Sequence, residues 1–400
     1  MSHGLNPDRL NRIPAFLAAK YVDKGRLPHA ATLVARHGEI AHLSCIGEAR
    51  PGVLLKDDAI FRIASMTKPV TSLALMMLVE EGRVALSDPL VKYCPEFAKT
   101  GVFVAGGGAI PFVTRPPAAP VRIVDLLRHT AGFTYGFQER NPVDAAYRAA
   151  RIDDFDADMT MDGFIAKLAG FPLLFDPGAH WNYSMATDVL GAVIERVEGR
   201  PFAEVLERRI FAPLGMVDTG FKVPAAQQHR LTDAWHFHPE HKMVPFDSAD
   251  KSRWAKERSF HSGGGGLVST LHDYHRFCAM LLGGGKLGDT RIISRKTLAL
   301  MTANHLPGGG DLTQHSVGVF AEDDSAGAGF GLGFAVTIDA ARTGMPTTNG
   351  DIYWGGMFST GFFVDPVEQL SMVFMTQLMP SSTYAVRREI KTMIHAAIDD

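Results

Sequence analysis

Residues 61–82 read FRIASMTKPVTSLALMMLVEEG and join a strand-like segment to a long apolar run. The run from Val70 to Val79 is apolar on nearly all sides, and Gly82 follows it as a helix-ending residue. A helix of this kind must be covered from every direction, so we expect it in the centre of the molecule. Ser65 and Lys68 then lie at the amino-terminal end of a buried helix.

Strand-like segments lie on both sides of this helix, toward the two ends of the chain. Residues 31–35 and 40–45 flank His37-Gly38 and predict a hairpin. Four further segments read as consecutive strands near the carboxyl terminus: 330–338, 352–354, 360–364 and 370–376, the last two joined by Asp365-Pro366. Amphipathic helices are expected at both ends, with apolar residues at Leu10, Ile13, Leu17 and Tyr21, and at Val386, Ile390, Met393 and Ala397.

The middle of the chain has a different pattern. From about residue 88 to 255, helical patches such as 121–129 and 188–197 alternate with Pro- and Gly-rich connections, and few strand patterns occur. A glycine run at 263–266 precedes another helix that begins at Thr270. We therefore expect an α/β (α+β) fold: a sheet domain from 1–90 and 256–400, a mostly helical domain from 91–255, and the active site between them.

Composition excludes several classes of protein. The chain is 46% apolar and 21% charged, and its net charge of −3 contains no block of like charges, so neither a nucleic acid nor a membrane is an expected partner. No apolar run approaches the roughly 20 residues of a membrane span, and the first residues show no secretion signal. The three cysteines follow no disulfide or zinc spacing. We expect a cytoplasmic, soluble protein without metal or cofactor, whose oligomeric state is open.

Ser65 and Lys68 are three residues apart at a helix start, so their side chains can touch. A serine hydroxyl becomes a good nucleophile when a neighbouring base takes its proton. Burial or a nearby positive charge makes a lysine available for this role, and the helix amino terminus supplies such a charge and favours an oxyanion. Arg62 is expected to order the loop before Ser65.

Two later elements could complete such a site. Tyr183, in a loop before a helix, could relay a proton between Ser65 and a leaving group. Trp354-Gly355-Gly356 lies on an expected strand, whose glycines allow close approach to a ligand. The N–H of Met357 could then join the N–H of Ser65 as an oxyanion hole.

The order of these elements resembles the serine β-lactamase and penicillin-binding-protein superfamily. More closely, it resembles the class C β-lactamase-like esterases (family VIII carboxylesterases) and the fungal statin acyltransferases. The likeness extends over nearly the whole chain and includes FRIAS at 61–65, LLRHTAG at 126–132 and FGLGF at 330–334. It implies a β-lactamase/transpeptidase-like fold, with an antiparallel sheet flanked by helices plus a mostly helical domain.

The resemblance also assigns roles. Ser65 would be the acylated nucleophile and Lys68 its general base, with Tyr183 relaying protons. Trp354, Gly355 and Gly356 would contact substrate, Trp354 lining the acyl pocket, while the N–H groups of Ser65 and Met357 would hold the oxyanion.

Two departures from the β-lactamase pattern point to the substrate. Met185 occupies the third place of the Tyr-x-Asn motif, where β-lactamases carry asparagine, and Trp354 stands where they carry a lysine. Each loss removes a polar partner of a β-lactam, and each such partner contributes about 1–3 kcal/mol. Together the two losses would slow the reaction with a β-lactam by roughly 10²–10⁴-fold. An uncharged ester, in contrast, is favoured by a tryptophan in place of the lysine. We therefore expect a serine carboxylesterase acting on short-chain esters, with weak or absent β-lactamase activity.

Other functions remain open. An acyltransferase would use the same acyl-enzyme with a different second acceptor, and a β-lactamase or a non-enzymatic relative is also possible. A metal-dependent hydrolase is a more distant alternative, because His236, His238 and His241 resemble a metal-binding signature with Glu240 in place of aspartate. No Gly-x-Ser-x-Gly pentapeptide occurs, so Ser359, between Gly356 and Gly361, is expected to be structural. His129 is expected to be buried and hydrogen-bonded, not catalytic.

Overall fold

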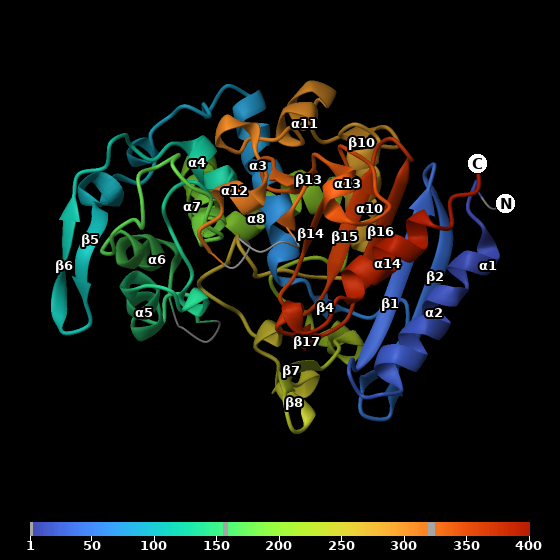
Figure 1. Cartoon of the computed structure of the whole chain (residues 1–400). Helices are drawn as coiled ribbons and strands as arrows, with labels where there is room; N and C mark the ends of the chain where they lie inside the picture. The colour runs from blue at the N-terminus through green and yellow to red at the C-terminus, as the bar shows by residue number, and fades with distance from the viewer. Residues whose placement is uncertain (1–2, 155–158, 319–324) are drawn as a thin grey trace.

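The expected amino-terminal hairpin and the last expected strands lie in one sheet of the computed structural model, which describes residues 3–154, 159–318 and 325–400. The sheet is antiparallel, in the order β12-β13-β14-β15-β16-β1-β2-β3, so β1 pairs directly with β16 (Figure 1). In this pairing Ala31 faces Met375 and Arg36 faces Leu370. The expected antiparallel sheet is confirmed. Its strands are β1 (His29–Arg36), β2 (Glu39–Arg50), β3 (Val53–Leu54), β12 (Ala328–Phe330), β13 (Ala335–Thr337), β14 (Ile352–Gly355), β15 (Gly361–Asp365) and β16 (Leu370–Met375).

Side chains along β16 alternate between two apolar clusters, as the two-residue period of a strand requires. Met372 and Phe374 pack with helices from both ends of the chain, whereas Val373 and Met375 face the central helices. The sheet therefore separates the terminal helices from the central ones (Figure 1). The helices concerned are α1 (Pro7–Leu10), α2 (Arg12–Leu17) and α14 (Val386–His395) on one face, and α3 (Thr67–Glu80) and α10 (Leu271–Leu282) on the other.

The apolar run from Val70 to Val79 lies in α3, and its burial confirms the prediction of a central helix. Val70, Leu73 and Leu75 have no exposed surface, and Lys68, one residue inside the helix, is only 1% exposed. The chain leaves the helix through Gly82, whose φ of +71° requires a residue without a side chain. This places the amino-terminal end of α3, with Ser65 and Lys68, inside the molecule.

The prediction of few strands between residues 91 and 255 is wrong in two places. Residues 102–115 form one hairpin and residues 234–247 another. The first is largely exposed and its register shifts twice, so no clean alternation marks it in the sequence. The second is only partly buried, its register also shifts, and Pro245 interrupts the strand-like pattern of its second strand. These strands are β5 (Val102–Gly107), β6 (Ile110–Arg115), β7 (Ala234–His238) and β8 (Lys242–Asp247).

The expected single strand at 330–338 is also wrong, because the chain turns within it. Gly333 has a φ of +104°, and a Cβ there would lie 2.5 Å from Ser72 of α3. The turn therefore brings the sheet against the buried helix at a place that only glycine permits. The segment forms the end of β12 and all of β13.

Apart from α7 (Ala186–Glu198), the remaining helices and strands have eight residues or fewer. Within the described residues, no helix combines the length and the apolar character needed to cross a membrane. The other helices are α4 (Ile123–Leu127), α5 (Pro142–Ala149), α6 (Met161–Leu168), α7 (Ala186–Glu198), α8 (Phe202–Leu206), α9 (Ala212–Leu214), α11 (Arg295–Met301), α12 (Leu312–His315) and α13 (Ala340–Thr343). The other strands are β4 (Phe61–Arg62), β9 (Val268–Ser269), β10 (Lys286–Leu287), β11 (Thr290–Arg291) and β17 (Leu378–Met379).

Candidate active site

The chain reaches Ser65 through a strained turn. β4 leads into a short 3-10 turn, Ala64–Met66, that continues directly into α3. Ala64 has a φ of +43° although it is not glycine, a left-handed conformation that costs about 1–2 kcal/mol. Backbone strain of this kind persists where the surroundings over-determine it, and it is concentrated at functional sites. The turn leaves Ser65 half-buried at the start of the helix.

The three side chains predicted to be catalytic meet at one oxygen atom. The Tyr183 hydroxyl donates to Ser65 Oγ at 2.6 Å, and Lys68 Nζ donates to the same atom at 3.2 Å. Lys68 Nζ also lies 4.5 Å from the centre of the Tyr183 ring. Both partners are largely shielded from solvent. Two groups able to exchange protons with Ser65 Oγ therefore touch it directly, and a nucleophilic serine needs a base at this distance.

Lys68 has two further partners that the sequence did not reveal. Its Nζ donates to the Tyr135 hydroxyl at 3.0 Å and to the Gly264 carbonyl at 2.7 Å. A neutral amine has two N–H bonds and one lone pair. With its N–H bonds directed at Tyr135 and Gly264, the lone pair would face Ser65 Oγ, as deprotonation of the serine requires.

Tyr135 is a suitable partner because it keeps its proton. Burial, together with the charge of Asp188, raises the pKa of Tyr135 well above 10. Its ring packs 5.3 Å from that of Tyr183. Tyr135 therefore presents a neutral hydroxyl to Lys68 at physiological pH.

The predicted substrate-binding strand lies beside these groups. The Trp354 ring packs 5.5 Å from that of Tyr183. Gly355, the next residue, faces the other way, and a Cβ there would overlap Arg387 of α14. A Cβ on Gly356 would overlap the carbonyl oxygen of Ile63, so the end of β14 passes against the backbone that leads to Ser65. Met357 follows directly in the turn to β15.

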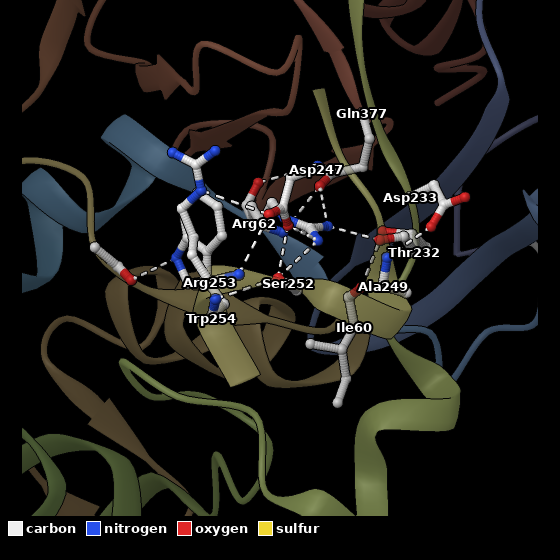
Figure 2. A network of polar contacts seen from close by, with 11 residues as sticks. Ile60, Arg62, Thr232, Asp233, Asp247, Ala249, Ser252, Arg253, Trp254 and Gln377 are labelled. Atoms are coloured by element: carbon white, nitrogen blue, oxygen red, sulfur yellow. Dashed lines mark hydrogen bonds and ion pairs between the residues drawn. The ribbon is translucent and has the colours of Figure 1, made fainter. Parts of the chain in front are cut away.

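Arg62, expected to order the loop before Ser65, is at the centre of a buried polar network (Figure 2). Its Nε donates to Asp247 Oδ2 at 2.8 Å, and Asp247 lies at the end of β8. The Gln377 side chain accepts from the Arg62 N–H at 3.1 Å and donates to the Arg62 carbonyl at 3.0 Å. The guanidinium also donates to Thr232 and Ser252. The network ties β4, three residues before Ser65, to three distant parts of the chain.

His129 is buried and hydrogen-bonded, which confirms its structural interpretation. Its Nδ1 lies 3.2 Å from Ser184 Oγ, and the side chain is almost fully covered. Burial, with a further contribution from Lys68, holds the pKa of His129 well below 6.5. The imidazole is therefore neutral and packs against the Tyr183 ring, 5.2 Å between centres.

The histidines of the metal-hydrolase alternative do not converge as a set of three. In the described parts of the chain, the group whose ligand atoms lie within 4.8 Å of one another is His238, Glu240 and His241, at the tip of the β7–β8 hairpin. His236 is absent from that group, and its Nδ1 lies 2.7 Å from the carbonyl of Phe237. Glu240 and His241 are exposed. The arrangement differs from the one that the sequence motif predicts.

Two of the partners of Lys68 could not be found by spacing. Tyr135 is 67 residues and Gly264 is 196 residues away in sequence. The glycine run at 263–266 was the available signal for Gly264, because consecutive glycines allow backbone to approach other groups closely. Tyr135 follows the 126–132 motif without any distinctive neighbour.

Comparisons with known proteins place the chain in a family. A family model described as beta-lactamase matches residues 16–396. Protein Rv1367c of Mycobacterium tuberculosis is 35% identical over 370 residues, which cover 90% of this chain and 88% of that protein. Esterase EstB of Burkholderia gladioli is 33% identical over 370 residues, covering 88% and 86%. The solved structure of EstCE1, described as a hydrolase with promiscuous acyltransferase activity, has a TM-score of 0.79 at 28% identity and covers 98% of this chain and 99% of its own.

Proposed function

The chain belongs to the beta-lactamase family, and from this premise we propose that it is a serine carboxylesterase that hydrolyses short-chain esters through an acyl-enzyme at Ser65. Its relatives support a serine hydrolase. The observation that carries the finer proposal is the convergence of the Tyr183 hydroxyl and Lys68 Nζ on Ser65 Oγ. In the proposed layout, these groups lie between a sheet domain (1–90 and 256–400) and a mostly helical domain (91–255).

In the proposed acylation step, Ser65 Oγ attacks the carbonyl carbon of the ester as its proton passes to Lys68. The N–H groups of Ser65 and Met357 hold the resulting oxyanion. Collapse of this intermediate breaks the bond to the alcohol, which receives the proton through Tyr183. Water then attacks the acyl-enzyme and releases the carboxylic acid and Ser65.

Labelling of the nucleophile tests this proposal. An alkyl fluorophosphonate, or p-nitrophenyl butyrate with rapid quenching, should add one group to the peptide that contains Ser65, as read by peptide mass spectrometry. Parallel dialysis against EDTA should leave turnover of p-nitrophenyl butyrate unchanged. A label on another serine, or loss of activity on chelation, would contradict the proposal and favour a different hydrolase class.

We expect esters to be much better substrates than β-lactams. Met185 is buried and offers no amide, and the Trp354 side chain replaces a cation beside Tyr183. Losing two polar partners of about 1–3 kcal/mol each should make kcat/KM for nitrocefin lower than for p-nitrophenyl butyrate by roughly 10²–10⁴-fold. Initial rates with both substrates, on one preparation of the enzyme, measure this ratio. Equal values would show that the two departures do not control substrate choice.

Acyl transfer is a second candidate, because EstCE1 is described as having promiscuous acyltransferase activity. The two reactions share every step up to the acyl-enzyme. Product analysis with an added alcohol distinguishes them, since transfer gives a new ester and hydrolysis gives only the free acid.

A further inference from the structure

A buried carboxylate lies behind Lys68. Asp188 is in the first turn of α7, five residues after Tyr183, and its side chain is only 2% exposed. It accepts hydrogen bonds from the Gly264 N–H at 3.0 Å and from the Ser262 hydroxyl. Burial raises the pKa of Asp188, and the neighbouring Lys68 opposes that shift. The reaction proposed above does not use this carboxylate directly.

Gly264 connects this carboxylate to Lys68. Its N–H is bound by Asp188, and its carbonyl accepts from Lys68 Nζ at 2.7 Å. A carbonyl oxygen can only accept, so this bond determines where one N–H of Lys68 points. The position of the Gly264 carbonyl therefore helps to set the direction of the lysine lone pair.

The backbone at Gly264 lies close to α3 and α7, and there is no room for a side chain at this position. A Cβ on Gly264 would overlap Asp188 Oδ2 and would lie 3.1 Å from the Tyr135 hydroxyl. The neighbouring residues are held to α3: the Thr71 hydroxyl donates to the Gly263 carbonyl at 2.8 Å, and the Leu267 N–H donates to Thr67 Oγ1 at 3.2 Å. Asp188 accepts a hydrogen bond from the Gly264 N–H and so holds the same segment to α7.

We propose that Asp188 is a positioning residue for Lys68: it holds Gly264 so that the Gly264 carbonyl orients the lysine amine toward Ser65. This inference rests on the proposed acyl-enzyme reaction. Asp188 is near the reacting atoms only through Gly264 and Lys68, so its loss should slow the chemical steps without weakening substrate binding. A misplacement of about 1 Å can cost roughly 10²-fold in rate.

Three variants test this role with p-nitrophenyl butyrate. Asp188→Ala removes the hydrogen bonds from Gly264 and Ser262 and should lower kcat by about 10²-fold. KM should stay within about twofold of the parent value. Asp188→Asn keeps an amide oxygen that can accept from the Gly264 N–H and should recover at least about tenfold of that loss. Ser262→Ala removes only the other bond and should stay within about threefold of the parent enzyme. Equal losses in Asp188→Ala and Ser262→Ala, or a loss confined to KM, would overturn the proposal.

A glycine pair keeps the inference testable if Asp188→Ala does not fold. Gly264→Ala introduces a side chain against Asp188 and Tyr135, whereas a Cβ on Gly265 meets nothing closer than 3.9 Å. Gly264→Ala should lower kcat by about 10²-fold, and Gly265→Ala should keep at least about a third of it. Similar activities in the two variants would contradict the role of Gly264. An inactive parent enzyme would instead reject the esterase itself, so the two failures are distinguishable.

Discussion

Ser65→Ala is expected to lower kcat for p-nitrophenyl butyrate by about 10⁴-fold or more, the scale seen when a hydrolase loses its nucleophile. The alanine methyl cannot form an acyl-enzyme, and the hydroxyl that Lys68 and Tyr183 both contact is gone. Activity that remains would come from binding and from the oxyanion hole. Treatment of the variant with an alkyl fluorophosphonate separates such residual activity, which it leaves in place, from a contaminating serine esterase, which it inactivates.

Ser359→Ala is the matched control for this experiment. Ser359 is another buried serine, 3% exposed, and its hydroxyl donates to the Leu378 carbonyl at 2.7 Å. Its removal costs about 1 kcal/mol of stability and should leave kcat within about tenfold of the parent enzyme. If Ser359→Ala were inactive and Ser65→Ala active, the assignment of the nucleophile would be wrong.

Asp247→Ala is expected to lower the free energy of unfolding by about 3–5 kcal/mol. Arg62 has no exposed surface, and Asp247 is its carboxylate partner (Figure 2). Removing that partner leaves a buried guanidinium with only neutral acceptors, which costs more than the pair itself contributes. Urea denaturation followed by circular dichroism, with the midpoint and slope fitted together, measures the loss.

An exposed ion pair supplies the control. Arg200 and Glu204 are four residues apart, and their side chains are 54% and 48% exposed. Glu204→Ala should change stability by no more than about 0.5 kcal/mol. Similar losses in Asp247→Ala and Glu204→Ala would mean that the buried network contributes little to the fold.

The same pair predicts a dependence of stability on pH. Burial alone would raise the pKa of Asp247, but the charge of Arg62 and the hydrogen bond from Ser252 outweigh it and hold that pKa below its usual range. A carboxylate with a depressed folded-state pKa contributes stability above its unfolded pKa of about 3.9, and that contribution is lost as the pH falls through the folded value. The difference in the free energy of unfolding between the parent enzyme and Asp247→Ala should therefore become smaller only in strong acid.

The sequence predicted the parts of the molecule whose signals are local. The run from Val70 to Val79 is apolar on nearly all sides, and the strands 361–365 and 370–375 are continuous buried runs beside a turn. The serine, lysine and tyrosine that meet at Ser65 Oγ were found because Ser65 and Lys68 are neighbours and the order of the motifs resembles a known family.

Other features depend on contacts between distant segments and have no local pattern. Tyr135 contacts Lys68 from 67 residues away, and Gly264 bonds both Lys68 and Asp188, which are themselves far apart in the sequence. The break at Gly333 is caused by the proximity of Ser72, which no periodicity reveals. The first hairpin was missed because strands with little burial lack a regular alternation, and the second because it is only partly buried and contains Pro245.

The pairing of β1 with β16 joins a strand that is made near the beginning of synthesis to one that is made near its end. During synthesis β1 leaves the ribosome more than 300 residues before β16, as the pair Ala31–Met375 illustrates, and until then its edge has no native partner on that side. A strand with an open edge can pair with other chains, so the nascent protein passes through a long period of vulnerability to aggregation. Ser65 is made early, but Trp354 and the sheet that supports it come almost last. A chain that stops before β16 should therefore be an insoluble product, not a partly active one.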